Sequence, residues 1–292
     1  MNESQPSEEQ INSIVDTALA EDTAHGDVTS EALVPPALHG MASILVKEQG
    51  VLAGTGAARR VFLRVDPSLE FKELINDGTR VEPGNVIATV SGRVTGILKA
   101  ERVALNFLQR LSGIATQAEQ YVAKTRGLTA RITDTRKTTP GLRQLEKYAV
   151  RMGGGHNHRL HLGDGILIKD NHLVAMRALG LSLKDIIVKA RQNAPPELKI
   201  EVEVTTVEEA LEVAEAGADI ILLDNMNPDD MRRVVDSIPT QIKTEASGGI
   251  TLENVRQAAM AGVGIISIGA LTHSAKALDI SLELEPETLR LD

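Results

Sequence analysis

After Thr129, this chain of 292 residues alternates repeatedly between strand and helix patterns, which limits the folds open to it. Helical patterns at 206–216 and 252–261 lie between short apolar runs typical of strands, and such runs lie at 164–169, 198–204, 219–224, 241–246 and 264–268. The last four begin about 22 residues apart, which is the spacing of parallel βα units. With a first strand at 131–133, the pattern predicts an α/β fold of six to seven units, an incomplete barrel. A doubly wound parallel sheet is the alternative.

The first 115 or so residues follow a different pattern. Ser7 and Gln10 have the spacing of a capping box, which predicts a helix over 8–21. Three β-type runs divided by turn residues predict a small antiparallel sheet or open sandwich, and these runs lie at 43–46, 81–90 and 94–98. A long helix is expected over 99–125, and the alternating tail at 278–284 predicts one more strand that returns to this part. We therefore expect an N-terminal α+β domain over 1–114, joined by the tail 275–292, and a barrel domain over 115–274.

Composition excludes several classes of protein. No run of about 18 apolar residues could span a bilayer, the start of the chain lacks the pattern of a signal peptide, and the expected location is the cytoplasm. The absence of cysteine excludes disulfides, thiolate metal sites and a cysteine nucleophile. A net charge of -9 and only five aromatic residues disfavour a protein that binds nucleic acid.

One segment has the opposite charge. Residues 131–172 hold eight Lys and Arg against four Asp and Glu, so this window is net +4 inside an acidic chain. Four of the seven histidines also lie in it, at positions 156, 158, 161 and 172. A local cationic patch can attract a small anion whatever the total charge, although a solvated basic face would have the same composition.

Polar residues follow nearly every predicted strand. They are Asp134-Thr135-Arg136-Lys137, Lys169-Asp170-Asn171, Glu203, Asp224-Asn225, Glu245-Ala246-Ser247-Gly248-Gly249 and Ser267-Ile268-Gly269-Ala270. Ligands of barrels and of open parallel sheets bind at the carboxyl ends of the strands. Six polar strand ends therefore predict a binding site at one edge of the sheet.

Carboxylates end two consecutive strands of this set, at Glu203 and Asp224. This placement suits Mg²⁺, which binds through one or two carboxylates plus substrate phosphates. Helix capping or pairing with a lysine is the alternative for each residue. Glu201 lies on the same face of its strand as Glu203 but deeper, so it must pair with a cation if it faces inward.

The last two strand-to-helix loops contain glycines, in Ser247-Gly248-Gly249 and in Ile268-Gly269-Ala270. Glycine there lets backbone N–H groups approach a phosphate, and the final loops of many barrels bind one. The cationic candidates are Arg136, Lys137, His158, Arg159 and Lys169. Their side chains match carboxylates and phosphates, and the histidine spacing lacks the helical zinc motif, so anion contacts are favoured over zinc.

Several motifs together resemble the quinolinate phosphoribosyltransferase family, also called carboxylating nicotinate-nucleotide pyrophosphorylases. They are Thr135-Arg136-Lys137-Thr138-Thr139-Pro140-Gly141-Leu142-Arg143, Glu146-Lys147-Tyr148-Ala149-Val150, Gly153-Gly154-Gly155-His156-Asn157-His158-Arg159 and Leu167-Ile168-Lys169-Asp170-Asn171-His172. Shorter matches, such as Glu101-Arg102-Val103, extend the resemblance over nearly the whole chain. The resemblance implies an open-sandwich domain, an incomplete barrel, and a homodimer in which each site is completed by the neighbouring subunit.

The resemblance also implies a reaction and a role for each matching residue. Quinolinate and phosphoribosyl pyrophosphate would give nicotinate mononucleotide, pyrophosphate and CO₂ with Mg²⁺, in NAD biosynthesis. Arg136, His158, Arg159 and Lys169 would hold the two quinolinate carboxylates, with Arg102 reaching in from the partner chain. Thr135 and Lys137 would also bind substrate. Lys137 and Lys169 would face the pyrophosphate, Glu203 and Asp224 the metal and the ribose, and the loops Ser247-Gly248-Gly249 and Ile268-Gly269-Ala270 the 5-phosphate. Lys137, Lys169, Glu203 and Asp224 are the expected catalytic residues.

Three alternatives stay open at the level of sequence. A lysine at the end of a barrel strand, here Lys169, can form a Schiff base, which would make the chain an aldolase. A non-catalytic sensor could bind phosphoribosyl pyrophosphate without turnover. A related transferase could use nicotinate or another pyridine in place of quinolinate.

Overall fold

The computed structural model describes residues 6–291, which form two compact units. One unit comprises the described residues up to Glu119, Thr138–Gly154 and the segment from Leu271; the other comprises Gln120–Lys137 and Gly155–Ala270. We call them the sandwich unit and the barrel unit. Residues 138–154 belong by their contacts to the sandwich unit, and the domain boundary expected at residue 114 stays a prediction.

The sandwich unit is built on an antiparallel sheet in the order β12-β1-β5-β3, with β13 also pairing with β1. The strands are β1 (Leu38–Val46), β3 (Glu70–Glu73), β5 (Val86–Arg93), β12 (Ile280–Leu284) and β13 (Arg290–Leu291), and β2 (Gly50–Val51) pairs separately with β4 (Arg80–Val81). Ile44 of β1 lies opposite Leu282, so the tail strand expected at 278–284 is confirmed as part of this sheet.

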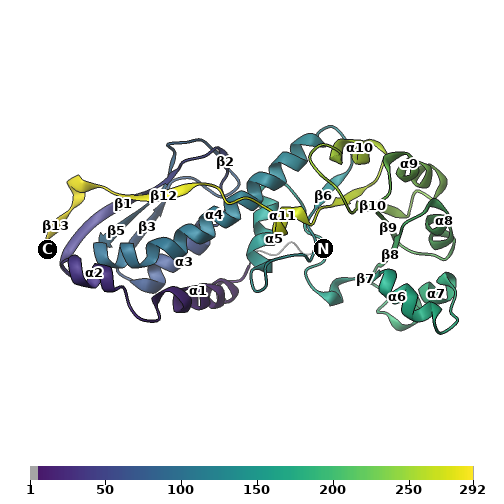
Figure 1. Cartoon of the computed structure of the whole chain (residues 1–292), viewed down its shortest axis with the longest axis horizontal. Helices are drawn as coiled ribbons and strands as arrows, with labels where there is room; N and C mark the ends of the chain where they lie inside the picture. Colours follow the sequence, from purple (N-terminus) through teal and green to yellow (C-terminus); the bar gives the residue numbers. More distant parts are fainter. Residues whose placement is uncertain (1–5, 292) are drawn as a thin grey trace. The chain divides into compact units, whose positions relative to one another are not determined.

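Helix α3 (Thr55–Val65) of the sandwich unit packs beside this sheet, and α1 (Glu8–Thr23) packs on α3 (Figure 1). The same unit contains α2 (Val28–Leu33) and α5 (Arg143–Met152), and the 3₁₀ turn Pro286–Thr288 precedes β13. The capping box of α1 is confirmed, because the Ser7 side chain accepts the N–H of Gln10 and the Gln10 side chain accepts the N–H of Ser7.

The strand expected at 94–98 is wrong, because these residues are the first turn of the long helix α4 (Val94–Lys124). Val94, Ile97 and Ala100 are all buried, at the three-residue spacing of one helix face. The β-branched side chains of Val94, Thr95 and Ile97 suggested a strand, but packing of this helix face outweighs that weak local preference.

The barrel unit is a six-stranded parallel sheet in the order β6-β11-β10-β9-β8-β7. The strands are β6 (Arg131–Thr133), β7 (Ile166–Ile168), β8 (Ile200–Val204), β9 (Ile220–Asp224), β10 (Lys243–Ser247) and β11 (Ile265–Ser267), so all six expected strand positions are confirmed. From β7 to β11 the order never reverses, and β6 lies beyond β11. This is the order of a barrel; a doubly wound sheet reverses at its centre.

Helices follow the strands of the barrel unit along the outside of the sheet (Figure 1). They are α6 (Asp170–Arg177), α7 (Leu183–Asn193), α8 (Val207–Glu215), α9 (Pro228–Ser237) and α10 (Val255–Met260); a 3₁₀ turn, Leu162–Asp164, precedes β7, and α11 (Ala270–His273) follows β11. Ile221 and Leu223 of β9 are fully buried, whereas Leu222 between them lines the pocket described below. Alternate residues of a strand thus serve the core under the helices and the ligand face.

Among the described residues, no helix has the length and apolar character needed to cross a membrane. The cytoplasmic location stays a prediction.

Candidate active site

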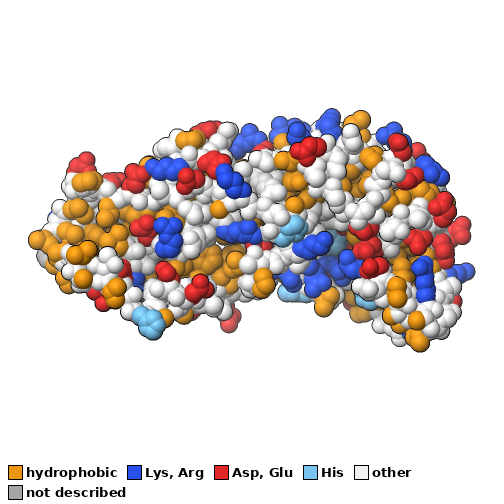
Figure 2. Space-filling view, viewed as in Figure 1, with side chains coloured by type: hydrophobic (Ala, Val, Ile, Leu, Met, Phe, Trp, Pro, Cys, Tyr) orange, Lys and Arg blue, Asp and Glu red, His pale blue; other side chains and the backbone are white. Residues whose placement is uncertain are grey.

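A pocket of about 640 Å³ lies at the carboxyl ends of the barrel-unit strands. Eleven of the expected site residues line it, and they are Thr135, Arg136, Lys137, His158, Arg159, Lys169, Glu203, Asp224, Ser247, Gly248 and Gly249. Basic, histidine and acidic side chains gather near β7 on the surface of this unit (Figure 2). The edge predicted from polar strand ends is therefore a pocket in the folded chain.

Four expected residues are not part of this lining. Arg102 is an exposed residue of α4 in the sandwich unit. Ile268 is buried and donates its N–H to the carbonyl of Thr133, and Gly269 and Ala270 lead directly into α11. Ser267, the last residue of β11 directly before this loop, does line the pocket. The roles expected for these four residues stay predictions.

The carboxylates Glu203 and Asp224 stand on neighbouring strands and share one face. Glu203 of β8 is in register with Leu222 of β9, and Asp224 lies two residues further along β9. Because alternate residues share a face, all three side chains line the pocket. Two carboxylates beside each other at the strand ends are an oxygen donor set of the kind that binds Mg²⁺ together with substrate phosphates.

Lys169 stands at the start of α6, directly after β7, and pairs with Glu203. Its Nζ lies 2.9 Å from Oε2 of Glu203, and the lysine side chain is 47% exposed whereas the glutamate is 14% exposed. An anionic ligand or a metal ion in the pocket would compete for one member of this pair. Pairing with a lysine was the alternative to metal binding for Glu203, and the geometry accommodates both.

The loop from Gly153 to Arg159 is held against β6 by backbone bonds. His156 donates its N–H to Ile132 and accepts the N–H of Asp134, which continues the parallel pairing beyond the six strands. The fully buried Asp134 carboxylate then accepts the backbone N–H of His158 at 2.8 Å and the side-chain amide of Asn157 at 2.6 Å. This anchor directs His158 and Arg159 into the pocket.

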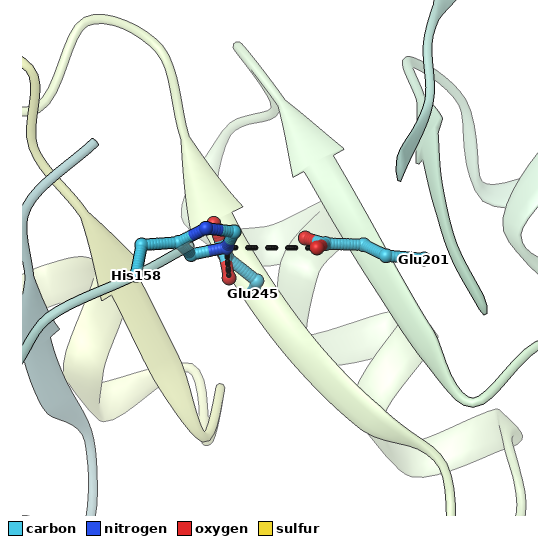
Figure 3. Close-up of side chains that lie close together, drawn as sticks. All are labelled: His158, Glu201 and Glu245. Atoms are coloured by element: carbon cyan, nitrogen blue, oxygen red, sulfur yellow. Dashed lines mark hydrogen bonds and ion pairs between the residues drawn. The ribbon is translucent and has the colours of Figure 1, made fainter. Parts of the chain in front are cut away.

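His158 contacts two buried carboxylates that approach from β8 and β10. Its Nε2 lies 3.2 Å from Oε2 of Glu245 and 3.5 Å from Oε2 of Glu201. Dashed lines mark these two contacts in Figure 3. Burial alone would lower the pKa of His158, but the hydrogen bonds and charges of Glu201 and Glu245 outweigh it and raise the pKa to about 10. The inward-facing Glu201 therefore has the cationic partner that the sequence required.

Arg159 is half-buried beside this cluster. Its Nη1 donates to the carbonyl of Gly165 at 2.8 Å. Burial lowers the pKa of its guanidinium, and the charge of Arg136 acts in the same direction, whereas Glu201 and Glu245 oppose the shift. Two arginines held close together in a pocket favour binding of an anion between them.

Glycines shape the loop after β10. Gly248 and Gly249 have φ angles of +81° and +60°, a left-handed conformation that other residues rarely adopt. A Cβ on Gly248 would lie only 2.5 Å from Oδ1 of Asn225, which itself has a φ of +54° and lines the pocket. The loop therefore places bare backbone at the pocket wall, as a phosphate site requires.

Five residues of the pocket lining were not among the expected site residues, although the three polar ones had been noted at strand ends; the five are Leu167, Leu222, Asn225, Glu245 and Ser267. Glu245 was visible as the residue two positions before Ser247, on the same strand face, and Asn225 as the polar residue after Asp224. Of the four histidines in the basic window, only His158 lines the pocket; His172 caps α6 by accepting the N–H of Lys169.

A parallel sheet of barrel order, with cations, carboxylates and bare backbone at its carboxyl edge, defines an α/β-barrel enzyme for an anionic substrate. The N-terminal domain of quinolinate phosphoribosyl transferase matches residues 27–112, and its C-terminal domain matches residues 114–283. The chain belongs to the quinolinate phosphoribosyltransferase family.

Similar proteins cover almost the full chain. A probable carboxylating nicotinate-nucleotide pyrophosphorylase of Bacillus subtilis is 44% identical over 94% of this chain and 93% of its own. A mitochondrial decarboxylating quinolinate phosphoribosyltransferase of Nicotiana glauca is 42% identical over 95% of this chain and 83% of its own. The crystal structure of NadC from Streptococcus pyogenes superposes with a TM-score of 0.91 at 39% identity, covering 97% of this chain and 99% of that one.

Proposed function

We propose that the barrel-unit pocket transfers the phosphoribosyl group of phosphoribosyl pyrophosphate to quinolinate, which yields nicotinate mononucleotide, pyrophosphate and CO₂. The observation that carries this assignment is the gathering of Arg136, Lys137, His158, Arg159 and Lys169 in one pocket with Glu203 and Asp224. Quinolinate has two carboxylates and the donor has a phosphate and a pyrophosphate, so the pocket must offset several negative charges at once.

We assign the cations of the pocket to different parts of the two substrates. Arg136, His158 and Arg159 hold the carboxylates of quinolinate. They line the part of the pocket formed by the end of β6 and by the loop at 153–159 that Asp134 anchors, called the anchored loop below. Lys137 and Lys169 face the pyrophosphate, where their charge stabilises the leaving group as the bond to ribose C1 breaks. The pyridine nitrogen attacks C1 and becomes quaternary, so the ring accepts the electron pair when the adjacent carboxylate leaves as CO₂, and a proton then takes its place.

Glu203 and Asp224 fit Mg²⁺, since both are carboxylates on one face at the end of adjacent strands. The ion, when bound, supplies positive charge against the pyrophosphate oxygens. In our proposal the same two side chains also accept hydrogen bonds from the ribose hydroxyls. In our proposal the Ser247-Gly248-Gly249 loop offers backbone N–H groups to the 5-phosphate, as do Gly269 and Ala270 of the second loop. The N–H of Ile268 is already donated to Thr133, so Ile268 would contribute only by its place in that loop.

The experiment incubates the purified protein with Mg²⁺, phosphoribosyl pyrophosphate and either quinolinate or nicotinate, and measures mononucleotide, pyrophosphate and CO₂. We expect product from quinolinate. Reaction of nicotinate alone would show a related transferase, binding without turnover would show a sensor, and trapping of Lys169 by borohydride with a carbonyl substrate would show an aldolase. Each of these results overturns the proposal.

Arg136→Ala and Arg159→Ala test the carboxylate contacts. Each change should lower kcat/KM for quinolinate by about 100-fold, because a charge-assisted hydrogen bond is lost from a partly buried site. Any loss with a pyridine monocarboxylate should be smaller. Arg126→Ala is the control, since Arg126 is exposed and does not line the pocket.

We further propose that the active form is a homodimer and that Arg102 of one chain serves the pocket of the other. Mixing inactive Arg102→Ala and Lys169→Ala chains tests this, because a mixed dimer then contains one pocket with both residues intact. Random reassociation should restore about a quarter of the wild-type activity. If Arg102 served its own chain, no mixture would regain activity.

A further inference from the structure

The side chains of His158, Glu201 and Glu245 form one cluster at the proposed pocket, and two of them, His158 and Glu245, line it. Of the three, only His158 has a role in the reaction proposed above. Figure 3 shows both carboxylates directed at one ring nitrogen of His158. The three side chains come from the anchored loop, β8 and β10, so the fold brings together residues distant in the chain.

Burial of the two glutamates would lower the stability of the fold if no cation stood beside them. Glu201 is 4% exposed and Glu245 is 1% exposed. Two carboxylates taken out of water need opposite charge and hydrogen bonds, because an unpaired buried charge is strongly destabilising. Among the described residues, no group lies within hydrogen-bonding distance of Oε1 of Glu201, so its Oε2 contact with His158 is an important source of compensation.

We propose that Glu201 and Glu245 are positioning residues that hold the His158 ring in one orientation and as a cation, so that its charge is available to the carboxylates of the substrate. This inference rests on the proposed function for the identity of the ligand. A neutral imidazole has one N–H and one unprotonated nitrogen, and a carboxylate is a poor partner for the unprotonated nitrogen. Two carboxylates converging on Nε2 therefore select the form with a proton there and, by their charge, the form protonated on both nitrogens.

The charged groups around His158 support the same assignment. Glu201 approaches from β8, Glu245 from β10, and Arg159 follows in the same loop with Arg136 beside it. Although burial acts to lower it, the two glutamates raise the pKa of His158 to about 10. Because this value lies above that of an unfolded histidine, the contact stabilises the fold fully below about pH 6.5 and loses its effect as pH rises through 10.

A metal ion is the rival occupant of this cluster. One nitrogen of His158 and one oxygen each of Glu201 and Glu245 lie within 4.8 Å of one another, a spacing that could hold a cation. Metal binding would require a deprotonated ring nitrogen, and the guanidinium of Arg159 beside the carboxylates disfavours an added positive charge. We therefore argue for the proton, and the metal becomes an outcome of the test.

The first experiment measures the protonation of His158 directly, from the imidazole ¹⁵N chemical shifts of the full-length protein between pH 5.5 and 9.5, with His158→Gln used to assign the signals. We expect both ring nitrogens of the wild type to stay protonated through about pH 8.5. In Glu245→Gln the ring should lose its proton at a pH at least about one unit lower, because one of two charges is gone. Glu212→Gln, an exposed glutamate of α8, should change nothing.

The second experiment uses the pH dependence of turnover. Glu245→Gln should raise KM for quinolinate about tenfold at pH 7 and more at pH 8.5, while KM for phosphoribosyl pyrophosphate changes less. A merely structural role would lower activity equally at both pH values and for both substrates. Glu201→Gln should act in the same direction, and Glu245→Asp, which keeps the charge, should retain more of the pH-8.5 activity than Glu245→Gln.

The wild-type titration alone can overturn the proposal, even if a variant fails to fold. A midpoint near pH 6.5 would show that the carboxylates do not hold the ring as a cation. Ring signals that respond to Zn²⁺ or to a chelator would show that the cluster is a metal site. These measurements need no turnover, so a protein that holds His158 charged but does not convert quinolinate would refute the proposed function and leave the protonation result standing.

Discussion

The side chain of Asp134 fixes the backbone of His158, because Oδ1 of this fully buried carboxylate accepts the His158 N–H at 2.8 Å. The other oxygen accepts the amide of Asn157, so one side chain at the end of β6 fixes two consecutive residues of the loop. The position of the pocket histidine therefore depends on a residue two positions before Arg136 that itself does not line the pocket.

We expect Asp134→Asn to lower kcat/KM for quinolinate by about tenfold or more and the free energy of unfolding by about 1–3 kcal/mol. The new amide places a donor opposite the donor of Asn157, which leaves buried polar groups unsatisfied. Steady-state kinetics and urea denaturation measure the two effects. Asp164→Asn is the matched control, because Asp164 also accepts backbone N–H groups but is exposed. Equal effects of the two changes would contradict the anchoring role.

Gly248→Ala should raise KM for phosphoribosyl pyrophosphate about tenfold and change KM for quinolinate less. A methyl group there would meet Asn225 at 2.5 Å, and the φ of +81° costs a residue with a Cβ about 1–2 kcal/mol. Gly249→Ala is the comparison, since its Cβ would lie 3.6 Å from Asn225 and only the backbone strain would remain. If quinolinate binding suffered more than donor binding, the loop would not be the phosphate site.

Removal of divalent cations should stop turnover, and Mg²⁺ should restore it. Asp224→Asn should raise the Mg²⁺ concentration needed for half-maximal activity about tenfold or more, because one of two carboxylates is lost. Glu203→Gln should do the same, and it also releases Lys169 from its ion pair. Glu212→Gln should leave the Mg²⁺ requirement unchanged. Full activity in excess chelator would refute a metal at these residues.

Asp66 should contribute to the stability of the sandwich unit in a pH-dependent way. The hydrogen bond from Arg93 and those from Ser68 lower its pKa to about 2 despite burial. A depressed pKa means that the stabilisation is complete above about pH 4 and is lost as pH falls through 2. Asp66→Asn should therefore lower the free energy of unfolding at pH 7 by only about 1 kcal/mol, because Arg93 is 50% exposed and water screens the ion pair.

Thermal unfolding at pH 7 and at pH 2.5 measures this effect, and the difference between Asp66→Asn and wild type should shrink at the lower pH. Asp22→Asn, at an exposed position of α1, should change stability by less than about 0.5 kcal/mol at either pH. A constant difference at both pH values would show that charge is not the cause.

Gly153→Ala should destabilise the protein by about 1–3 kcal/mol through overpacking. Its Cβ would lie 2.2 Å from the carbonyl oxygen of Ala115 and 2.7 Å from the Cβ of Ala118, so α5 would have to move away from α4. Gly56→Ala is the control: it meets nothing within 4 Å inside α3, where alanine should add up to about 1 kcal/mol. Urea denaturation measures both, and equal midpoints would contradict the close approach.

The alternation of strands and helices in the barrel unit, and the polar ends of its strands, follow from the amino-acid sequence alone. Periodicity and turn residues are local properties, and they predicted all six strands and the capped helix α1. Local pattern failed at 94–98, because burial of Val94 and Ile97 on one helix face outweighs their β-propensity. The family resemblance likewise depended on contiguous motifs.

Only the tertiary structure decided which polar groups meet. Glu201 and Glu245 stand on strands separated by β9, and no local pattern indicates that both contact the same nitrogen of His158. Nor could sequence show that His158 is the one of the four histidines in the basic window that lines the pocket, or that Ile268 is directed into the core. Alternation assigns each side chain to a face of its strand, but the curvature of the sheet and the path of the loop set the distances between faces.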